Sequence, residues 1–302
     1  MDAVYGRYLL VMLEMILHYE IMQRAVLAGM IIGVIAPLIG VFLVVRRLSL
    51  IADALSHVTL SGVAAGLLLQ KYFSFFQSVN PIYVGMAFSM IGSFFVEQLR
   101  RLYRSYQELA IPVILSGGIG LGVVLISAAN GFNVDVAGYL FGSILAVGKS
   151  EIWSIAAAGM VVAAVVFFFY KELFALSFDE ESAALSGIPR RWINGLFIVS
   201  VALVITASIR VVGILLVSGL ITLPVAASLQ IAKSFRQALW LSVLFAQIAV
   251  LSGLAAAFYL DWASGGTIIL VSVAILLSVL AIKEGSRRIR RFFANRPAHK
   301  EG

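Results

Sequence analysis

Between two long apolar runs the sequence reads Arg46-Arg47-Leu48-Ser49-Leu50-Ile51-Ala52-Asp53-Ala54-Leu55-Ser56-His57. Asp53 and His57 are four residues apart, so in a helix their side chains lie on one face, one turn apart. A carboxylate and an imidazole placed in this way can bind one cation or share one proton. At roughly 1.5 Å of rise per residue, His57 lies about 15 Å beyond the two arginines, near the middle of a bilayer. An ionisable residue at that depth indicates a functional site.

The composition around this stretch is that of an integral membrane protein. Of the 302 residues 62% are apolar and 12% are charged, and the mean hydropathy is +1.04. Such a chain has too few polar side chains to cover the surface of a soluble globule. The apolar runs are continuous rather than alternating, which favours helices over a β-barrel. The chain has no cysteine, so disulfides and thiolate metal ligands are excluded.

The spacing of the charged residues predicts an all-α, polytopic bundle with about nine transmembrane spans. The stretch 132–148 is apolar but short, so we expect a re-entrant or interfacial piece there. Arg210 alone separates two of the spans, which predicts a very tight turn. We expect an interfacial N-terminal segment at 1–20, a transmembrane domain at 21–285 and a basic cytoplasmic tail at 286–302. The predicted spans lie near 25–45, 51–70, 82–99, 109–129, 152–170, 192–209, 211–231, 237–259 and 263–282.

The distribution of Lys and Arg gives an orientation. With nine spans and a cytoplasmic C-terminus, 17 of the 22 Lys and Arg residues fall on the cytoplasmic side, as the positive-inside rule requires. Counting 132–148 as a full crossing would invert one side of the chain and spoil this agreement. Because the basic residues sit at the ends of apolar runs, the net charge of +7 reflects topology, and no nucleic-acid partner is expected.

Asp53 and His57 are the first candidates for a metal site. Imidazole and carboxylate together suit first-row divalent ions such as Zn²⁺ or Mn²⁺. The alternative is that Asp53 caps the helix or bonds to a neighbour while His57 is a hydrogen-bonded core residue. Asp135, at the head of the short segment, is a further candidate acid, although solvated loop carboxylates are common.

The sequence of the longest predicted cytoplasmic loop, 171–191, predicts a short helix within it. We expect Ser177 to cap it and Gly187, followed by Pro189, to end it. Three acidic residues near its first turn are favoured by the helix dipole. A short helix on this face would offer a surface to a soluble partner, whereas the alternative is a solvated connector. The acidic residues are Asp179, Glu180 and Glu181.

Four stretches carry a resemblance to a known family. They are 44–57 with Gly62 after it, 139–147, 177–181 through Gly187, and 212–217 through Pro224-Val225-Ala226-Ala227. In order and spacing they resemble the membrane permease subunits of bacterial ABC importers for zinc and manganese. The resemblance extends over about 25–230.

This resemblance implies a permease that pairs with a second copy of itself, two cytoplasmic ATP-binding subunits and an extracellular metal-binding protein. Positions matching Asp53 and His57 are associated with the metal pathway, and the residues around Asp53 look closer to the zinc branch than to the manganese branch. No permanently bound cofactor is expected, only transported Zn²⁺ or Mn²⁺. The segment matching 177–190 is the coupling helix that docks on the ATPase, which implies a coupling role for Phe178, Asp179, Glu180, Glu181 and Gly187.

Two alternatives remain open. In a proton-coupled secondary carrier of metal or other cations, Asp53 and His57 would relay protons and no ATPase would be needed. An intramembrane enzyme or a structural scaffold is the other alternative, but an enzyme would need more convergent polar residues in its spans. The chain has no Gly-x-x-x-x-Gly-Lys-Ser loop, so we expect a transport subunit whose ATP hydrolysis comes from a separate chain.

Overall fold

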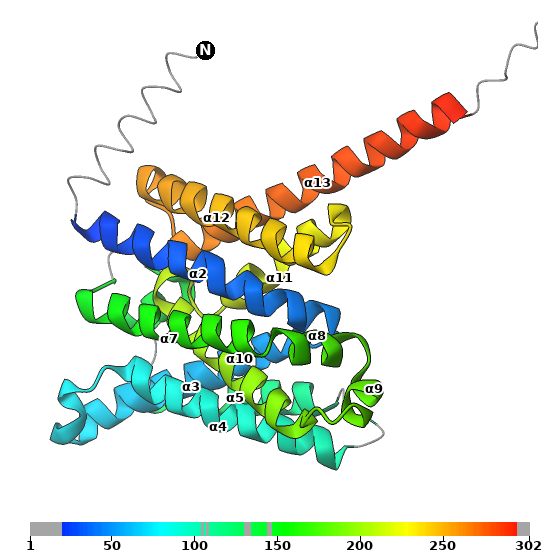
Figure 1. Ribbon diagram of the computed structural model, residues 1–302. Coiled ribbons are helices and arrows are strands. Elements are labelled where there is room, and N and C mark those ends of the chain that lie inside the picture. Colours follow the sequence, from blue (N-terminus) through cyan, green and yellow to red (C-terminus); the bar gives the residue numbers. More distant parts are fainter. Residues whose placement is uncertain (1–19, 104–105, 107–108, 130–133, 144–146, 295–302) are drawn as a thin grey trace, which may run out of the picture.

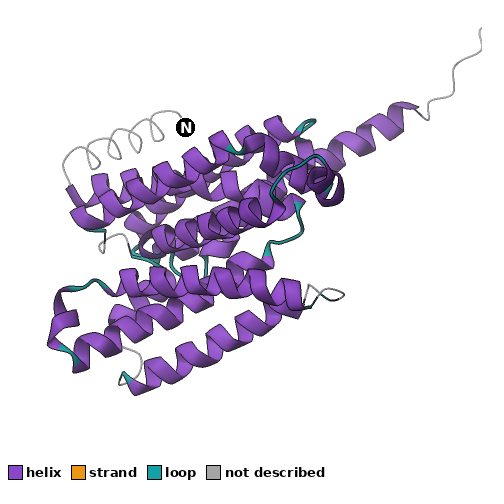
Figure 2. Cartoon of the chain, turned by 60° about the horizontal axis from the view of Figure 1, so that its bottom comes forward, coloured by secondary structure: helices purple, strands orange, loops and turns teal. Residues whose placement is uncertain are grey.

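The computed structural model describes residues 20–103, 106, 109–129, 134–143 and 147–294, with side chains described for all of these except 134–136 and 286–294. In these ranges the chain consists of helices and short connections, without strands (Figure 2). The predicted all-α class is therefore confirmed.

Among the described residues, nine helices are long and apolar enough to cross a membrane, as predicted. In α11 the candidate span begins at Ile214, and in α13 it ends at Gly285. Four shorter elements complete the described chain: η1 Ser74–Ser78, α6 Val134–Phe141, α8 Tyr170–Phe178 and α9 Glu180–Leu185. The nine long helices are α2 Glu20–Val45, α3 Leu50–Tyr72, α4 Pro81–Leu102, α5 Ala110–Ala128, α7 Lys149–Phe168, α10 Arg190–Val212, α11 Val217–Ile231, α12 Phe235–Leu260 and α13 Ser264–Ala294.

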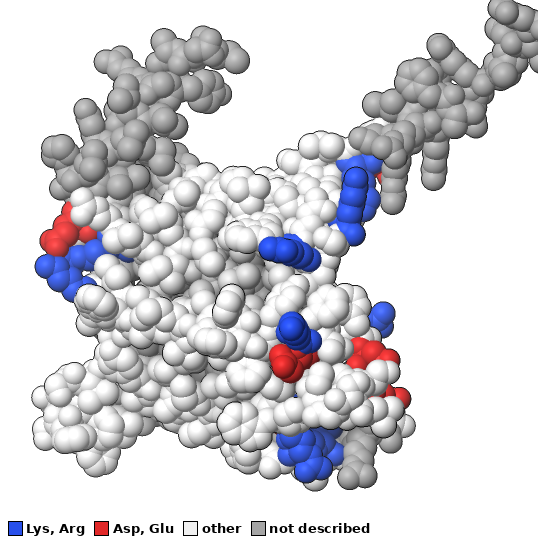
Figure 3. Space-filling view, viewed as in Figure 1, with Lys and Arg blue, Asp and Glu red and all other residues white. Residues whose placement is uncertain are grey.

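Charged side chains gather at the two ends of the bundle, and a broad uncharged surface lies between them (Figure 3). At one end Glu20 pairs with Arg24 and Lys149. At the other end, called here the α9 end, α8 lies beside α2, and α9 follows α8 and contacts α10 (Figure 1). This distribution is typical of helices that cross a hydrocarbon layer.

Helix α3, which carries Asp53 and His57, is held between α4 and α5 by close backbone contacts. A Cβ at Gly118 of α5 would lie 3.1 Å from the Val58 backbone nitrogen, and one at Gly92 of α4 would lie 2.8 Å from Val58 Cγ1. Ser61 Oγ on α3 donates a hydrogen bond of 2.6 Å to the Gly118 carbonyl. Small residues allow helices to approach in this way in a membrane, so glycines fix the position of α3.

Gly213, and not Arg210, makes the turn between α10 and α11. Helix α10 continues through Arg210 to Val212, so the predicted turn at Arg210 is wrong. Gly213 has φ +84°, and a Cβ there would lie 2.4 Å from the Leu140 carbonyl oxygen. The turn sits here because the end of α6 crosses it, with Ile214 N donating to the Tyr139 carbonyl at 2.9 Å.

The apolar stretch 132–148 contains α6, a helix of eight residues. Such a helix is about 12 Å long and cannot cross a core of about 30 Å. Its last residues instead pack on the α10–α11 turn. The described part of this stretch thus agrees with a piece that does not span the membrane.

Candidate functional site

Asp53 and His57 lie one turn apart on α3, and both are half-buried. Neither side chain forms a hydrogen bond with another described residue. No group of three or more His, Cys, Asp or Glu side chains that could hold a metal comes together within the described ranges. The pair can therefore supply two ligands to an ion, and no third His, Cys, Asp or Glu side chain of the described residues joins them.

The neighbouring hydroxyls on α3 are engaged elsewhere. Ser56 Oγ donates to the Ala52 carbonyl at 2.7 Å, and Thr59 Oγ1 donates to the Leu55 carbonyl at 2.6 Å. Both side chains are buried. Back-bonding of this kind satisfies a hydroxyl within its own helix, so these residues are poor candidates for ligands.

Asp135 lies on α6, but its side chain falls outside the described residues. Helix α6 itself lies near the part of α3 that follows His57. Leu140 of α6 packs in one cluster with Ala64 of α3 and Ile126 of α5. The structure thus brings α6 to the end of α3 that is remote from Arg46, and leaves a role for Asp135 as a prediction.

The short helix predicted in 171–191 exists as α9, but Asp179 caps it and not Ser177. Asp179 Oδ1 accepts hydrogen bonds from the Glu181 and Ser182 amides at 3.1 and 3.0 Å, and Ser182 Oγ donates to Oδ2 at 2.5 Å. Ser177 is still inside α8, where its hydroxyl donates to the Leu173 carbonyl at 2.6 Å. The hydrogen bonds from Ser182, first from its hydroxyl and then from its amide, lower the pKa of the Asp179 carboxyl.

Gly187 ends α9, as predicted. Its φ is +85°, and the Ile188 amide donates back to the Ala183 carbonyl at 3.2 Å, an arrangement that favours glycine. Around the helix, Phe178 is 63% exposed and Leu185 is 90% exposed. Two large apolar side chains thus project from the α9 end, beside the exposed carboxylate of Glu181.

A partly buried network that the sequence did not predict, called here the Asn194 network, joins α9 to the loop before α3. Arg46 Nη2 donates to Asn194 Oδ1 at 2.7 Å, and Asn194 Nδ2 donates to Glu180 Oε1 at 3.0 Å. Glu180 also pairs with Arg190 Nε at 2.6 Å. Burial lowers the pKa of Arg46 to about 10, against the opposing effect of Glu180. Arg46 therefore stays charged at neutral pH, and its cation lies 5.1 Å from the centre of the Phe197 ring.

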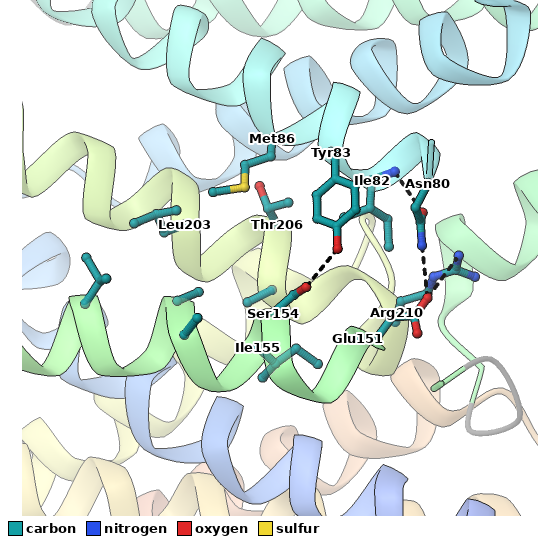
Figure 4. A pocket seen from close by; sticks show the side chains of 14 residues that line it. Asn80, Ile82, Tyr83, Met86, Glu151, Ser154, Ile155, Leu203, Thr206 and Arg210 are labelled. Atoms are coloured by element: carbon teal, nitrogen blue, oxygen red, sulfur yellow. Dashed lines mark hydrogen bonds and ion pairs between the residues drawn. The ribbon is translucent and has the colours of Figure 1, made fainter. Parts of the chain in front are cut away.

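A second network, called here the Glu151 network, lies at the opposite end of the bundle, where α7 begins. Figure 4 shows its side chains from close by. Asn80 Nδ2 donates to Glu151 Oε1 at 3.0 Å, and Arg210 Nη2 lies 3.9 Å from the same oxygen. Arg210 Nη2 also donates to Tyr139 Oη at 2.9 Å, and Arg210 Nε is buried without a hydrogen-bond partner among the described residues. The network borders a largely apolar cavity of about 280 Å³ between α4, α7 and α10. It joins four elements: α4, α6, α7 and α10.

The nine long apolar helices in the described part of the chain define a polytopic membrane protein. The chain belongs to the ABC 3 transport family, whose model matches residues 18–283. The predicted family is thereby confirmed.

Relatives of known name agree with this assignment. The chain is 33% identical to the "Probable metal transport system membrane protein" of Treponema pallidum, over 90% of this chain and 98% of that one. It is 30% identical to the manganese transport system membrane protein MntC of Halalkalibacterium halodurans, over 86% of each chain. It is 25% identical to the high-affinity zinc uptake system membrane protein ZnuB of Haemophilus influenzae, over 88% of this chain and 99% of that one.

A solved structure has the same fold. PsaBC from Streptococcus pneumoniae, determined in complex with Fab, matches with a TM-score of 0.77 and 26% identity. The match covers 88% of this chain and 93% of that one. The arrangement of helices described above is therefore that of a solved relative.

Proposed function

We propose that this chain is the membrane permease of an ABC importer for a divalent metal ion, and that Asp53 and His57 bind the ion as it crosses. The observation that carries the proposal is this pair: two side chains suited to metal binding, half-buried within a span and without a hydrogen bond to another described residue. Its setting supports it, because the chain belongs to a transport family and relatives are named for metal, manganese and zinc transport.

Two ligands suit a transit site better than a closed one. A structural zinc site takes four protein ligands and holds its ion, whereas an ion that must pass through needs a site weak enough to release it. Water, or the same pair from a second copy of the chain, would complete the coordination. The permease is accordingly proposed to act as a homodimer.

The ion is zinc or manganese. Imidazole and carboxylate accept both, and relatives at 30% and 25% identity are named for manganese and for zinc. The stretch Arg46 to Asp53 resembles the zinc branch, so zinc comes first in the proposal. Uptake of radioactive zinc in competition with manganese, measured on the purified importer, separates the two ions.

Helix α9 is proposed to be the surface on which a cytoplasmic ATP-binding subunit docks. The exposed Phe178 and Leu185 would fill apolar recesses of that subunit. The Asn194 network then provides a path from the docking helix, through Glu180 and Asn194, to Arg46 seven residues before Asp53. The α9 end and the C-terminus are cytoplasmic in this proposal, and the partner at the opposite end is an extracellular metal-binding protein.

Substitution of His57 tests the proposal. In proteoliposomes that contain the complete importer, we expect His57→Ala to abolish ATP-driven metal uptake while complex assembly, followed by size-exclusion chromatography, is unchanged. Ser208→Ala is a matched control, since the Ser208 hydroxyl lies buried in a span and donates only to the Val204 carbonyl. Normal uptake by His57→Ala would overturn the role of the pair.

Dependence on the ATPase distinguishes the importer from a proton-coupled carrier, an alternative that the family assignment does not support. We expect no metal uptake into liposomes that contain the permease without its ATPase, whether or not a pH gradient is present. Uptake driven by a pH gradient alone would favour the carrier.

A further inference from the structure

A groove of about 410 Å³ runs between α4 and α10 at the α9 end of the bundle. Met90 of α4 and Leu196 and Val199 of α10 form its apolar part. Arg101 and Arg191 stand where the groove opens at the helix ends. Glu97 of α4 also lines the groove and is paired with Arg101, so Arg191 supplies the net positive charge of this mouth, and the interior is largely apolar.

The length of this groove matches one leaflet of a bilayer. Val199 follows Arg191 by eight residues, and Met90 precedes Arg101 by eleven. At 1.5 Å per residue these distances are about 12 and 16 Å along the helix axes, close to half of a core of about 30 Å. The groove therefore extends from the membrane surface to about the midplane.

Gly195 borders open space in the groove. It lines the groove on α10, and a Cβ built there would meet no atom within 4 Å. A larger side chain at this position would therefore begin in open space and occupy part of the groove.

Arg191 is the free cation of the groove. It has no hydrogen-bond or ion-pair partner among the residues that the structure describes, whereas its neighbour Arg190 is paired with Glu180 and Arg101 is paired with Glu97 at 3.1 Å. Trp192, which is 73% exposed, stands beside Arg191. An indole next to an unpaired guanidinium is typical of side chains at a membrane interface.

We propose that this groove binds one anionic glycerophospholipid of the adjacent leaflet. Its phosphate lies at Arg191, and an acyl chain lies along Met90, Leu196 and Val199. A guanidinium is well suited to a phosphate, which it can contact through two parallel hydrogen bonds.

The surface beside the groove favours a lipid over a second copy of the chain. Ile91, Phe94 and Phe95 of α4 are each more than half exposed, and large apolar side chains of this kind suit contact with lipid tails. Helix contacts in membranes are enriched instead in small residues. The exposed small residues Gly117 and Gly120 are on α5 and not beside this groove.

Lipid binding to the full-length protein in detergent tests the proposal, without metal or nucleotide. Native mass spectrometry would count bound dioleoyl phosphatidylglycerol and dioleoyl phosphatidylcholine added at equal concentration. We expect the anionic lipid to be retained at least several-fold more than the zwitterionic lipid. Arg191→Gln should remove this preference, whereas Arg236→Gln, at an exposed arginine in the first turn of α12, should leave it unchanged.

A second pair of variants tests the space itself. Gly195→Leu should lower retention of both lipids by filling the groove, and Gly266→Leu, at a glycine of α13 that also has open space around it, should not. Equal retention of the two lipids, or retention unaffected by Arg191→Gln and Gly195→Leu, would overturn the proposal. So would a disulfide between copies through Val199→Cys, since the chain has no other cysteine and the groove would then be covered by a second copy.

Discussion

The Asp53/His57 pair and the Glu151 network each contain a carboxylate but surround it differently. Asp53 and His57 come from one helix and form no hydrogen bond with another described residue. The Glu151 network joins side chains from four elements to one another. Unpaired polar groups in a membrane interior are costly, so a pair left without partners is where a ligand is expected, whereas a network that pairs its own members is expected to be structural.

Of the substitutions that compare these two regions, removal of the Asp53 carboxylate should have the largest effect on metal uptake. Asp53→Asn keeps the shape of the side chain but removes its charge, so we expect metal uptake to fall by about 100-fold, equivalent to roughly 2.7 kcal/mol of lost binding to a charged group. The melting temperature should not fall, because the carboxylate has no hydrogen bond to lose. Uptake by the proteoliposome-embedded importer and thermal unfolding of the same sample measure the two effects. A drop in stability at unchanged uptake would reverse the assignment.

The Glu151 network should give the opposite result. In Glu151→Ala, Asn80 loses an acceptor and Arg210 loses its carboxylate, although both charged side chains are partly exposed, at 14% and 20%. We expect a loss of about 1–3 kcal/mol in stability from the groups left unsatisfied. Uptake per folded importer should stay within a few-fold of the wild type. If uptake is abolished in well-folded protein, the network takes part in transport and the contrast fails.

The glycine contact that fixes α3 gives a smaller effect. A methyl group at Gly118 would meet the Val58 nitrogen at 3.1 Å and the His57 carbonyl carbon at 3.3 Å. Helix α5 would therefore have to move away from α3 and the Asp53/His57 pair. Overpacking of this kind costs about 1–3 kcal/mol, more than the 0.5–1 kcal/mol that alanine gains over glycine in a helix. We expect Gly118→Ala to lower both the melting temperature and uptake.

Gly120 of the same helix is the matched control, since nothing lies within 4 Å of a Cβ there. Gly120→Ala should be neutral or stabilising and should transport normally. Equal behaviour of the two variants would mean that the position of α3 does not depend on this contact.

The spans and the shared face of Asp53 and His57 could be predicted from the sequence because both depend on local spacing. Apolar runs of span length specify the helices, and a separation of four residues puts Asp53 and His57 on one face. The Glu151 network could not be predicted in this way. Asn80 and Glu151 are 71 residues apart, as are Tyr139 and Arg210, and no periodicity links residues on four separate elements.

The structure differs from the sequence prediction at two other places, the Asn194 network and the cap of α9, and both differences have physical reasons. Asn194 is a lone amide inside an apolar span, and a polar group at such a position is a signal of a partner within the protein. Ser177 and Asp179 are both good capping residues, and the choice depends on where α8 ends. Phe178, its last residue, packs on Phe174 and Phe235, and this tertiary contact places the cap at Asp179.

The cap of α9 is a second self-paired cluster, and it should give the smallest effect. The pKa of Asp179 lies below its ordinary value because Ser182 donates to the carboxylate. A lowered pKa in the folded state means that the charged cap stabilises α9 above about pH 4 and is lost only as the pH falls through that lowered value. Between pH 5 and pH 8, hydrogen exchange of the Glu181 and Ser182 amides should therefore show no titration of Asp179.

In the same pH range, the Glu181 and Ser182 amides of Asp179→Asn should exchange at the wild-type rate, since asparagine also accepts a hydrogen bond at an N-cap. Asp179→Ala should exchange faster at these amides because it has no acceptor. If Asp179→Asn exchanges as fast as Asp179→Ala, the negative charge and not the hydrogen bonds holds the helix. Asp179 would then resemble Asp53, for which we expect the charge to matter, more than Glu151.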